Sequence, residues 1–248
     1  MQRQWRLWLM ALVFFTRVPV HIKNFQESDL NHSTRYFPLV GVLVGMVAGA
    51  VYLAAAQWLP TEIAVLASMA ATIAFTGAFH EDGLADSADG LGGGWQKEQV
   101  LTIMQDSRLG SYGAVALFLM LMAKFQALVH LPAGLLLVTM LAGHSLSRFA
   151  AVLVIYTQAY VRSEGKSKPL ATRLSFAELL LAGIFGLAPL ALLQPGYWLA
   201  LLPVALVWLW FSRKLQKRLG GYTGDCLGAM QQLTELAFYL GVLALGYR

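Results

Sequence analysis

The chain of 248 residues contains few charged residues and almost no cysteine. Asp, Glu, Lys and Arg together make up only 12% of it, about half the share that a soluble domain carries. The single cysteine, Cys226, excludes an internal disulfide and a metal site built from several cysteines. What is abundant is apolar, since 58% of the residues are hydrophobic. This composition predicts an all-α, polytopic integral membrane protein, because each spanning helix needs roughly 20 predominantly apolar residues.

The apolar residues form separate segments of about the length of a membrane span. These segments lie at 36–59, 62–80, 110–130, 133–156, 176–194, 197–211 and 229–247. A shorter stretch, Trp5–Val20, has arginine near both ends and fits an interfacial or re-entrant helix as well as an eighth span. Although it looks like a signal peptide, no small-residue cleavage site follows, and we expect it in the mature protein. No repeat or boundary divides the chain, which predicts one domain over 1–248.

Positive charge alternates from one connection to the next. The region Arg17–Arg35 and the loops 81–109, 157–175 and 212–228 contain Lys and Arg, whereas the intervening short loops contain neither. Positive loops face the cytoplasm, so we predict about seven crossings, an N-terminal helix that does not cross, and a C-terminus outside. This loop bias also explains much of the net charge of +5. We therefore predict a lipid bilayer as the surroundings and no nucleic acid as a partner.

Three aspartates follow the second apolar segment at a helical spacing. Asp82, Asp86 and Asp89 are spaced i, i+4, i+7, which puts them on one face of a helix, where like charges repel unless a cation lies between them. Oxygen ligands without cysteine suit Mg²⁺, and ionisable groups at the membrane boundary are candidates for function. We predict that the three residues bind Mg²⁺ and act in catalysis. The alternative is a solvated acidic face.

The residues around these aspartates support less specific predictions. Glu81 and Glu98 lie off the shared face, and we expect both to be solvated. His80 stands at the end of a span, where a structural hydrogen bond and a ligand role are both open. Gly90 and the glycines at 92–94 would allow a backbone to approach phosphate.

Further ionisable groups lie beyond the acidic segment. Asp106 is a candidate metal ligand, and Arg108 suits bidentate contact with phosphate, with a topology anchor as its alternative. Lys124, His144 and Arg148 lie inside predicted spans and should face the bundle interior because lipid disfavours them. There they are candidate contacts for an anionic diphosphate, while snorkelling or internal ion pairing are the alternatives.

A glycine-rich turn precedes the last apolar segment. Gly220–Gly–Tyr–Thr–Gly224 leads into Asp225, with Glu235 further along the same segment. A helix that begins after such a turn can bind phosphate or metal through its N-terminus. Asp225 is therefore a further candidate metal ligand, although an ordinary turn has the same residues.

Taken together, these motifs resemble the cobalamin synthase family, and the likeness extends over nearly the full length. It includes Phe15–Pro19, Phe37–Gly41, His80–Gly90, Ile103–Gly113 and Gly221–Ala229. The resemblance implies that adenosylcobinamide-GDP and α-ribazole (or its 5′-phosphate) give adenosylcobalamin (or its 5′-phosphate) and GMP, with Mg²⁺ required. It also implies a bacterial cytoplasmic membrane, an active site facing the cytoplasm, and Arg17 and Gly90 among the substrate contacts. Other corrinoid-assembly enzymes or a second copy of the chain are open as partners.

A more distant resemblance is to the CDP-alcohol phosphotransferases. Asp86-x-x-Asp89–Gly90 matches the opening of their motif, but Gly93–Gly94 replace the expected Ala-Arg and Gly110 replaces the final aspartate. Asp82 or Asp225 would then supply the missing carboxylate. The mechanism that follows is in-line attack by a ribazole hydroxyl on the corrinoid-side phosphorus, with an aspartate as the base.

Two other classes of function are open to a polytopic chain with these residues. A secondary transporter would use the intramembrane charges as a solute pathway, but the inverted repeats common in transporters are absent from the sequence. A non-enzymatic scaffold for a biosynthetic assembly would leave the three aspartates unexplained.

Overall fold

The computed structural model describes residues 2–20, 22, 27–162 and 174–247, and its regular elements in these ranges are helices. The α-helices are α1 (Gln2–Phe15), α2 (Glu27–Ser33), α3 (Phe37–Ala55), α4 (Thr61–Thr76), α5 (Phe79–Gly93), α6 (Lys97–Ile103), α7 (Ser111–Val129), α8 (Ala133–Thr157), α9 (Phe176–Leu187), α10 (Leu201–Leu219) and α11 (Gly224–Gly246). Short 3₁₀ helices are η1 (Thr34–Tyr36), η2 (Ala188–Leu192) and η3 (Pro195–Ala200). The predicted all-α membrane bundle is confirmed.

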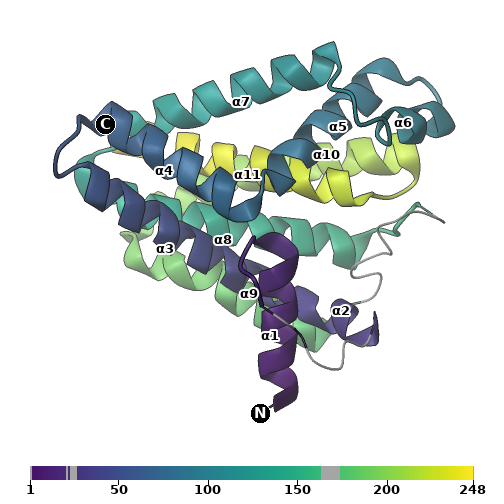
Figure 1. The fold of residues 1–248 in the computed structure, drawn as a ribbon, viewed down its shortest axis with the longest axis horizontal. Helices are drawn as coiled ribbons and strands as arrows, with labels where there is room; N and C mark the ends of the chain where they lie inside the picture. The colour runs from purple at the N-terminus through teal and green to yellow at the C-terminus, as the bar shows by residue number, and fades with distance from the viewer. Residues whose placement is uncertain (1, 21, 23–26, 163–173, 248) are drawn as a thin grey trace.

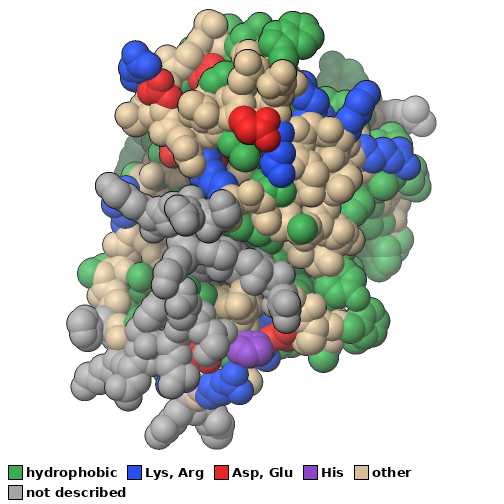
Figure 2. Space-filling view, turned by 90° about the vertical axis from the view of Figure 1, so that its right-hand side faces the viewer, with side chains coloured by type: hydrophobic (Ala, Val, Ile, Leu, Met, Phe, Trp, Pro, Cys, Tyr) green, Lys and Arg blue, Asp and Glu red, His purple; other side chains and the backbone are tan. Residues whose placement is uncertain are grey.

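The long helices run back and forth along one axis of the molecule (Figure 1). The α3–α4 and α7–α8 connections and the C-terminus lie at the left end, and the α10–α11 turn lies at the right. The right end therefore carries α6 and the α10–α11 turn, which belong to two of the regions that the sequence marks as positive. Seen from that side, Figure 2 shows Lys and Arg side chains interspersed with acidic ones. This arrangement agrees with the predicted alternation of loops between the two sides of a membrane.

Small residues allow α3 and α8 to pack closely. A Cβ added at Gly41 would lie 2.3 Å from the carbonyl oxygen of His144, and one at Gly45 would lie 2.7 Å from Cα of Leu141. The two glycines are four residues apart on α3, a spacing that lets helices approach closely within membranes. This contact positions the polar part of α8 against the centre of the bundle.

The predicted span at 62–80 is broken. Its first part is α4, after which Gly77 and Ala78 both adopt left-handed backbone conformations, with φ of 68° and 58°. The chain then continues as α5 at an angle of 86° to α4. The apolar residues of the segment concealed this break, and it frees α5 to follow a path of its own.

The prediction of a loop over 212–228 is wrong, because α10 continues to Leu219 and α11 begins at Gly224. Only Gly220–Thr223 connects them, and Gly220 has a φ of 75°, which glycine adopts without strain. The basic residues at the end of α10 are typical of a cytoplasmic loop, but here the helix continues beyond its apolar part.

Helix α1 is too short to cross a bilayer by itself. Its 14 residues extend roughly 21 Å at 1.5 Å per residue, against a hydrocarbon core of about 30 Å. Figure 1 shows it crossing the direction of α3 and α8, which supports the non-crossing N-terminal helix. By length and composition, four helices of the described chain are able to span a membrane, or five if the bent pair α4–α5 counts as one. The number of seven crossings stays a prediction.

Candidate active site

Helices α5 and α11 cross at two glycines, and this crossing brings separate acidic residues together. A Cβ at Gly83 would lie 2.8 Å from the carbonyl oxygen of Asp225, and one at Gly228 would lie 3.3 Å from Cα of Gly83. Any larger residue at Gly83 would separate the two backbones. The beginning of α11, with Asp225, is thereby held against the acidic face of α5.

At this crossing the side chains of Asp82 and Asp86 lack partners. Neither makes a hydrogen bond or ion pair with the described residues, and Asp82 is exposed while Asp86 is half-buried. The negative charges of Asp225, Asp82 and Asp89 act on Asp86, and the positive charge of Arg162 opposes them. The excess negative charge makes this part of the molecule attractive to a cation.

Asp89 holds the beginning of α7. Its Oδ2 accepts a hydrogen bond from the Gly110 amide at 2.8 Å, and its Oδ1 accepts one from the Gly113 amide at 2.9 Å. A carboxylate at a helix N-terminus satisfies amides that have no partner within the helix and interacts favourably with the helix dipole. The carboxylate leaves no room for a Cβ at either glycine. The structure thus gives Asp89 a positioning role, while metal binding by Asp89 stays a prediction.

Asp225 is paired with Arg162, a residue that motif reasoning missed. The guanidinium Nη2 of Arg162 lies 2.8 Å from Oδ2 of Asp225. Backbone hydrogen bonds between the segments after α8 and before α11 place it: Val161 donates to Tyr222 at 3.0 Å, and Tyr222 donates to Ala159 at 3.0 Å. In the sequence Arg162 was one basic loop residue among several. The basic residues Lys166, Lys168 and Arg173 lie outside the described residues.

A cavity of about 150 Å³ lies beside the α5–α11 crossing. One part of its wall is aromatic and another carries charges of both signs. Its lining includes Phe14, Phe15, Phe37, Phe79, His80, Asp82, Arg148, Arg162, Asp225 and Gln231. The cavity thus brings an acidic residue of each crossing helix together with two guanidinium groups and an apolar surface.

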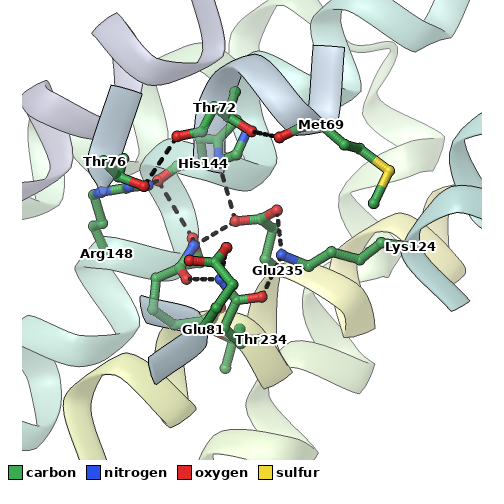
Figure 3. A network of polar contacts seen from close by, with 12 residues as sticks. Met69, Thr72, Thr76, Glu81, Lys124, His144, Arg148, Thr234 and Glu235 are labelled. Atoms are coloured by element: carbon green, nitrogen blue, oxygen red, sulfur yellow. Dashed lines mark hydrogen bonds and ion pairs between the residues drawn. The ribbon is translucent and has the colours of Figure 1, made fainter. Parts of the chain in front are cut away.

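A second polar cluster lies deeper between α7, α8 and α11 (Figure 3). Lys124 donates to Glu235 Oε1 at 2.7 Å and to Gln232 Oε1 at 2.7 Å, and Nδ1 of His144 lies 3.1 Å from Glu235 Oε2. Gln231 also donates to Glu235. We call these five residues the Glu235 network. As predicted, Lys124 and His144 face the bundle interior, where Lys124 forms an internal ion pair with Glu235 and His144 lies against the same carboxylate.

The Glu235 network reaches α5 and Arg148. Gln232 donates to Oε1 of Glu81 at 3.0 Å, and Oε2 of Glu81 is buried without a hydrogen-bond partner among the described residues. The expectation that Glu81 is solvated is therefore wrong, because α11 covers it, whereas Glu98 is exposed as expected. Arg148 is buried, donates to the carbonyl of His144 at 2.9 Å, and interacts electrostatically with Glu235 and Glu81.

The other predicted site residues lie apart from the cavity. Asp106 and Arg108 pair with each other at 2.6 Å on an exposed loop. Gly90 faces α6, since a Cβ there would lie 2.5 Å from Cγ of Met104. Arg17 is exposed, with its Nε 2.2 Å from the position that a Cβ of Gly77 would take. No hydrogen bond or ion pair among the described residues joins these four to the side chains of Asp82 or Asp225.

The donor chemistry at the α5–α11 crossing fits Mg²⁺ better than a transition metal. Asp82, Asp86 and Asp225 offer only oxygen, the ligand that hard cations prefer. No three His, Cys, Asp or Glu side chains in the described part of the chain are close enough to enclose a metal ion. Mg²⁺ does not need such a cage, because it is commonly held by one or two carboxylates together with waters and substrate phosphates.

Comparisons with known proteins identify the family. The family model for cobalamin-5-phosphate synthase matches residues 7–243. An adenosylcobinamide-GDP ribazoletransferase of Ralstonia pickettii (strain 12J) is 46% identical, with 98% of this chain and 97% of that protein covered. The protein of the same name in Shewanella amazonensis (strain ATCC BAA-1098 / SB2B) is 45% identical, with 98% of this chain and 97% of that protein covered. No solved structure matches the chain. The chain belongs to the cobalamin-5-phosphate synthase family.

Proposed function

We propose that the chain is a membrane transferase that joins adenosylcobinamide-GDP to α-ribazole or its 5′-phosphate and releases GMP. Its family and the printed name of its relatives support this reaction. The observation in the structure that carries the proposal is the cavity at the α5–α11 crossing, where the unpaired carboxylate of Asp82 meets the Asp225–Arg162 pair and the buried guanidinium of Arg148. The positive loops support a site that faces the cytoplasm, in the cytoplasmic membrane of a bacterium.

We propose that Mg²⁺ is held by one or two of the carboxylates Asp82, Asp86 and Asp225, together with waters and substrate phosphates. All three lie at the helix crossing, and Asp82 and Asp86 have no other partner in the described chain. A bound Mg²⁺ neutralises the charge of a diphosphate and of its leaving group. Because Arg162 already neutralises part of the charge of Asp225, Asp82 and Asp86 would supply most of the attraction for the cation.

The guanidinium groups of the cavity suit the substrate's phosphates. Arg162 and Arg148 lie on its wall, and in each of them Nε is buried without a hydrogen-bond partner among the described residues. A phosphate oxygen would satisfy these donors, and a planar guanidinium matches phosphate in a bidentate geometry. An aspartate not engaged by the cation would accept the proton of the attacking ribazole hydroxyl.

The transporter alternative receives less support. Of the intramembrane charges that suggested a solute pathway, Lys124 is paired with Glu235 in the Glu235 network. The space beside them is about 30 Å³, enough for about two waters, since each needs roughly 10–15 Å³. No observation favours transport over group transfer.

The decisive experiment is a measurement of GMP release by the purified full-length protein in lipid vesicles. With adenosylcobinamide-GDP, α-ribazole and Mg²⁺, we expect GMP and a cobalamin product in equal amounts. We expect neither when the divalent cation is removed by a chelator, and recovery when Mg²⁺ is restored. GMP formed without a corrinoid product would indicate hydrolysis and contradict the transferase, and full activity in the chelator would contradict the metal assignment.

A further inference from the structure

The aromatic wall of the cavity is built by three separate elements. Phe14 and Phe15 come from α1, Phe37 begins α3, and Phe79 begins α5. The ring of Phe15 lies 4.5 Å from that of Phe37 and 5.6 Å from that of Phe79, in edge-to-face arrangements. Aromatic groups that converge in this way form a pocket for another flat ring, since aromatic pairs favour edge-to-face and offset stacking.

One buried polar atom beside this wall lacks a partner. His80 is 3% exposed, and its ring is stacked on Phe15 with centroids 5.5 Å apart and planes 9° apart. Its Nε2 has no hydrogen-bond partner among the described residues. Buried polar groups are nearly always hydrogen-bonded, so the atom is suited to a ligand that offers one hydrogen-bonding group within an apolar surface.

The size of the cavity decides which part of the substrates it can enclose. Its volume of about 150 Å³ equals that of an engineered apolar cavity that takes up benzene, about 150 Å³. Pockets that enclose drug-sized ligands measure about 300–1,000 Å³, and a corrinoid is larger than such a ligand. The cavity therefore accepts a flat ring system, while the corrinoid has to remain outside it.

Both substrates of the proposed reaction contain a flat base, and the wall distinguishes them. Guanine carries several donors and acceptors along its edge, which would lose their hydrogen bonds if the base lay in the aromatic part of the cavity. The benzimidazole base of α-ribazole is apolar except for one free ring nitrogen, which accepts a hydrogen bond. With its proton on Nε2, His80 donates to that nitrogen.

Resting on the proposed function, we propose that this cavity binds the base of α-ribazole. Phe14, Phe15, Phe37 and Phe79 surround the ring, His80 Nε2 bonds its free nitrogen, and Asp82 and Asp225 at the same cavity lie near the sugar hydroxyls. The substrate class that the site selects is thus a nucleoside with a flat, apolar base. The corrinoid stays outside the cavity, and its diphosphate reaches the charged part of the wall, where Arg148 and Arg162 lie beside the aspartates.

The test compares the binding of two ligands to the full-length protein without catalysis. Titration calorimetry in detergent measures the affinity for α-ribazole alone and for GMP alone, with Phe79→Leu, Phe14→Leu and His80→Phe. We expect each variant to bind α-ribazole about tenfold more weakly, because stacking and a hydrogen bond are each of that order, and to bind GMP like the wild type. The control is Phe118→Leu, which alters an exposed ring on α7 and should change neither affinity.

The outcomes separate this proposal from the function on which it rests. Weaker binding of GMP with unchanged binding of α-ribazole would place guanine in the cavity and overturn the proposal. Unchanged affinity for both ligands would overturn it as well. Loss of both affinities together with a lowered Tm marks a misfolded variant. In that case the KM values of the variants at the half-buried Phe14 and Phe79 decide: the proposal requires a raised KM for α-ribazole and an unchanged KM for adenosylcobinamide-GDP. A wild-type protein that forms no GMP would refute the transferase itself, whatever the cavity binds.

Discussion

Two groups of carboxylates, one at the α5–α11 crossing and one deeper in the bundle, are treated differently by the fold. Glu235, deep in the bundle, is in contact with Lys124 from α7 and His144 from α8. Asp82 and Asp86, towards the end with the positive loops, have no such partner in the described chain. A charge deep in a membrane protein is stable only when it is paired or hydrated. The paired group therefore joins helices, and the unpaired group is left available to a ligand.

The first and largest expected effect concerns the unpaired group. Asp82→Asn and Asp86→Asn each keep the size of the side chain and remove its charge, so GMP release should fall by about 10³-fold if the charge stabilises the transferring phosphoryl group. Stability in detergent without metal should not fall, and relief of the repulsion around Asp86 should raise it for Asp86→Asn.

Glu98→Gln is the matched control, because Glu98 is exposed on α6 and has no place in the crossing. It should retain wild-type turnover and Mg²⁺ dependence. Near-normal turnover by both aspartate variants would show that the unpaired group is a solvated face. The lack of partners at Asp82 and Asp86 would then be no sign of a ligand site.

The second prediction concerns the paired group, where we expect a loss of stability. Glu235→Leu leaves the buried ammonium of Lys124 without its carboxylate, which should lower the free energy of unfolding by about 3 kcal/mol. Thermal unfolding in detergent measures this loss. The double variant Lys124→Met/Glu235→Leu removes both charges and should regain most of the stability, since apolar replacement of a whole buried pair is often neutral.

A double variant as unstable as the single one would show that the contacts of Glu235 with His144 and Gln231, rather than the ion pair, hold the helices together. A stable Glu235→Leu that has lost turnover would move Glu235 into the catalytic group. Either result would change the role that is assigned to Glu235.

The third prediction places Asp89 between the two groups. Asp89→Asn can accept only one of the two amide hydrogen bonds and removes the negative charge at the beginning of α7, so the free energy of unfolding should fall by about 2 kcal/mol. Chemical denaturation measures this loss. Turnover should fall less than for Asp82→Asn if Asp89 acts through position alone.

The control for Asp89 is Glu62→Gln, because Glu62 is an exposed acid in the first turn of α4. It should lose only about 0.3–1 kcal/mol, the usual size of a charge–dipole effect at a helix end. Equal losses for Asp89→Asn and Glu62→Gln would mean that the two amide bonds add nothing. A loss of turnover as large as that of Asp82→Asn would favour the predicted metal role of Asp89.

The sequence predicted the helices well because apolar length is a local property. The ends of α3, α7 and α8 lie within a few residues of the predicted segments. The break at Gly77–Ala78 was missed because the residues on both sides of it are apolar and a left-handed alanine has no sequence signature. The continuation of α10 was missed because basic residues are common both in cytoplasmic loops and on helices that extend beyond the lipid.

The site was predicted in its chemistry but not in its contacts. The spacing of Asp82, Asp86 and Asp89 placed them on a helix, and the glycine-rich turn singled out Asp225. The pairing of Arg162 with Asp225 joins residues 63 positions apart, which no local pattern reveals. Likewise Glu81 looked solvated because its burial depends on Gln232 of a distant helix. Gly83 and Gly228 were the available signal, since glycines in two segments can mark a close crossing.

The last and smallest expected effect concerns Arg108 and Asp106, an ion pair outside both groups. Their side chains are 88% and 39% exposed, and solvent screens such pairs. Hydrogen bonds from Arg108 lower the pKa of Asp106 to about 2, below the value of about 3.9 in an unfolded chain. The small contribution of the pair is therefore present above about pH 4 and is lost as the pH falls through 2. The Tm difference between wild type and Asp106→Asn should be slight at pH 7 and vanish near pH 2.

Arg108→Lys should change turnover and the KM for adenosylcobinamide-GDP less than about threefold, since one exposed contact contributes little. A tenfold rise in that KM alone would show that the planar guanidinium of Arg108 binds the diphosphate in a bidentate geometry. The substrate site would then extend from the α5–α11 crossing to this loop.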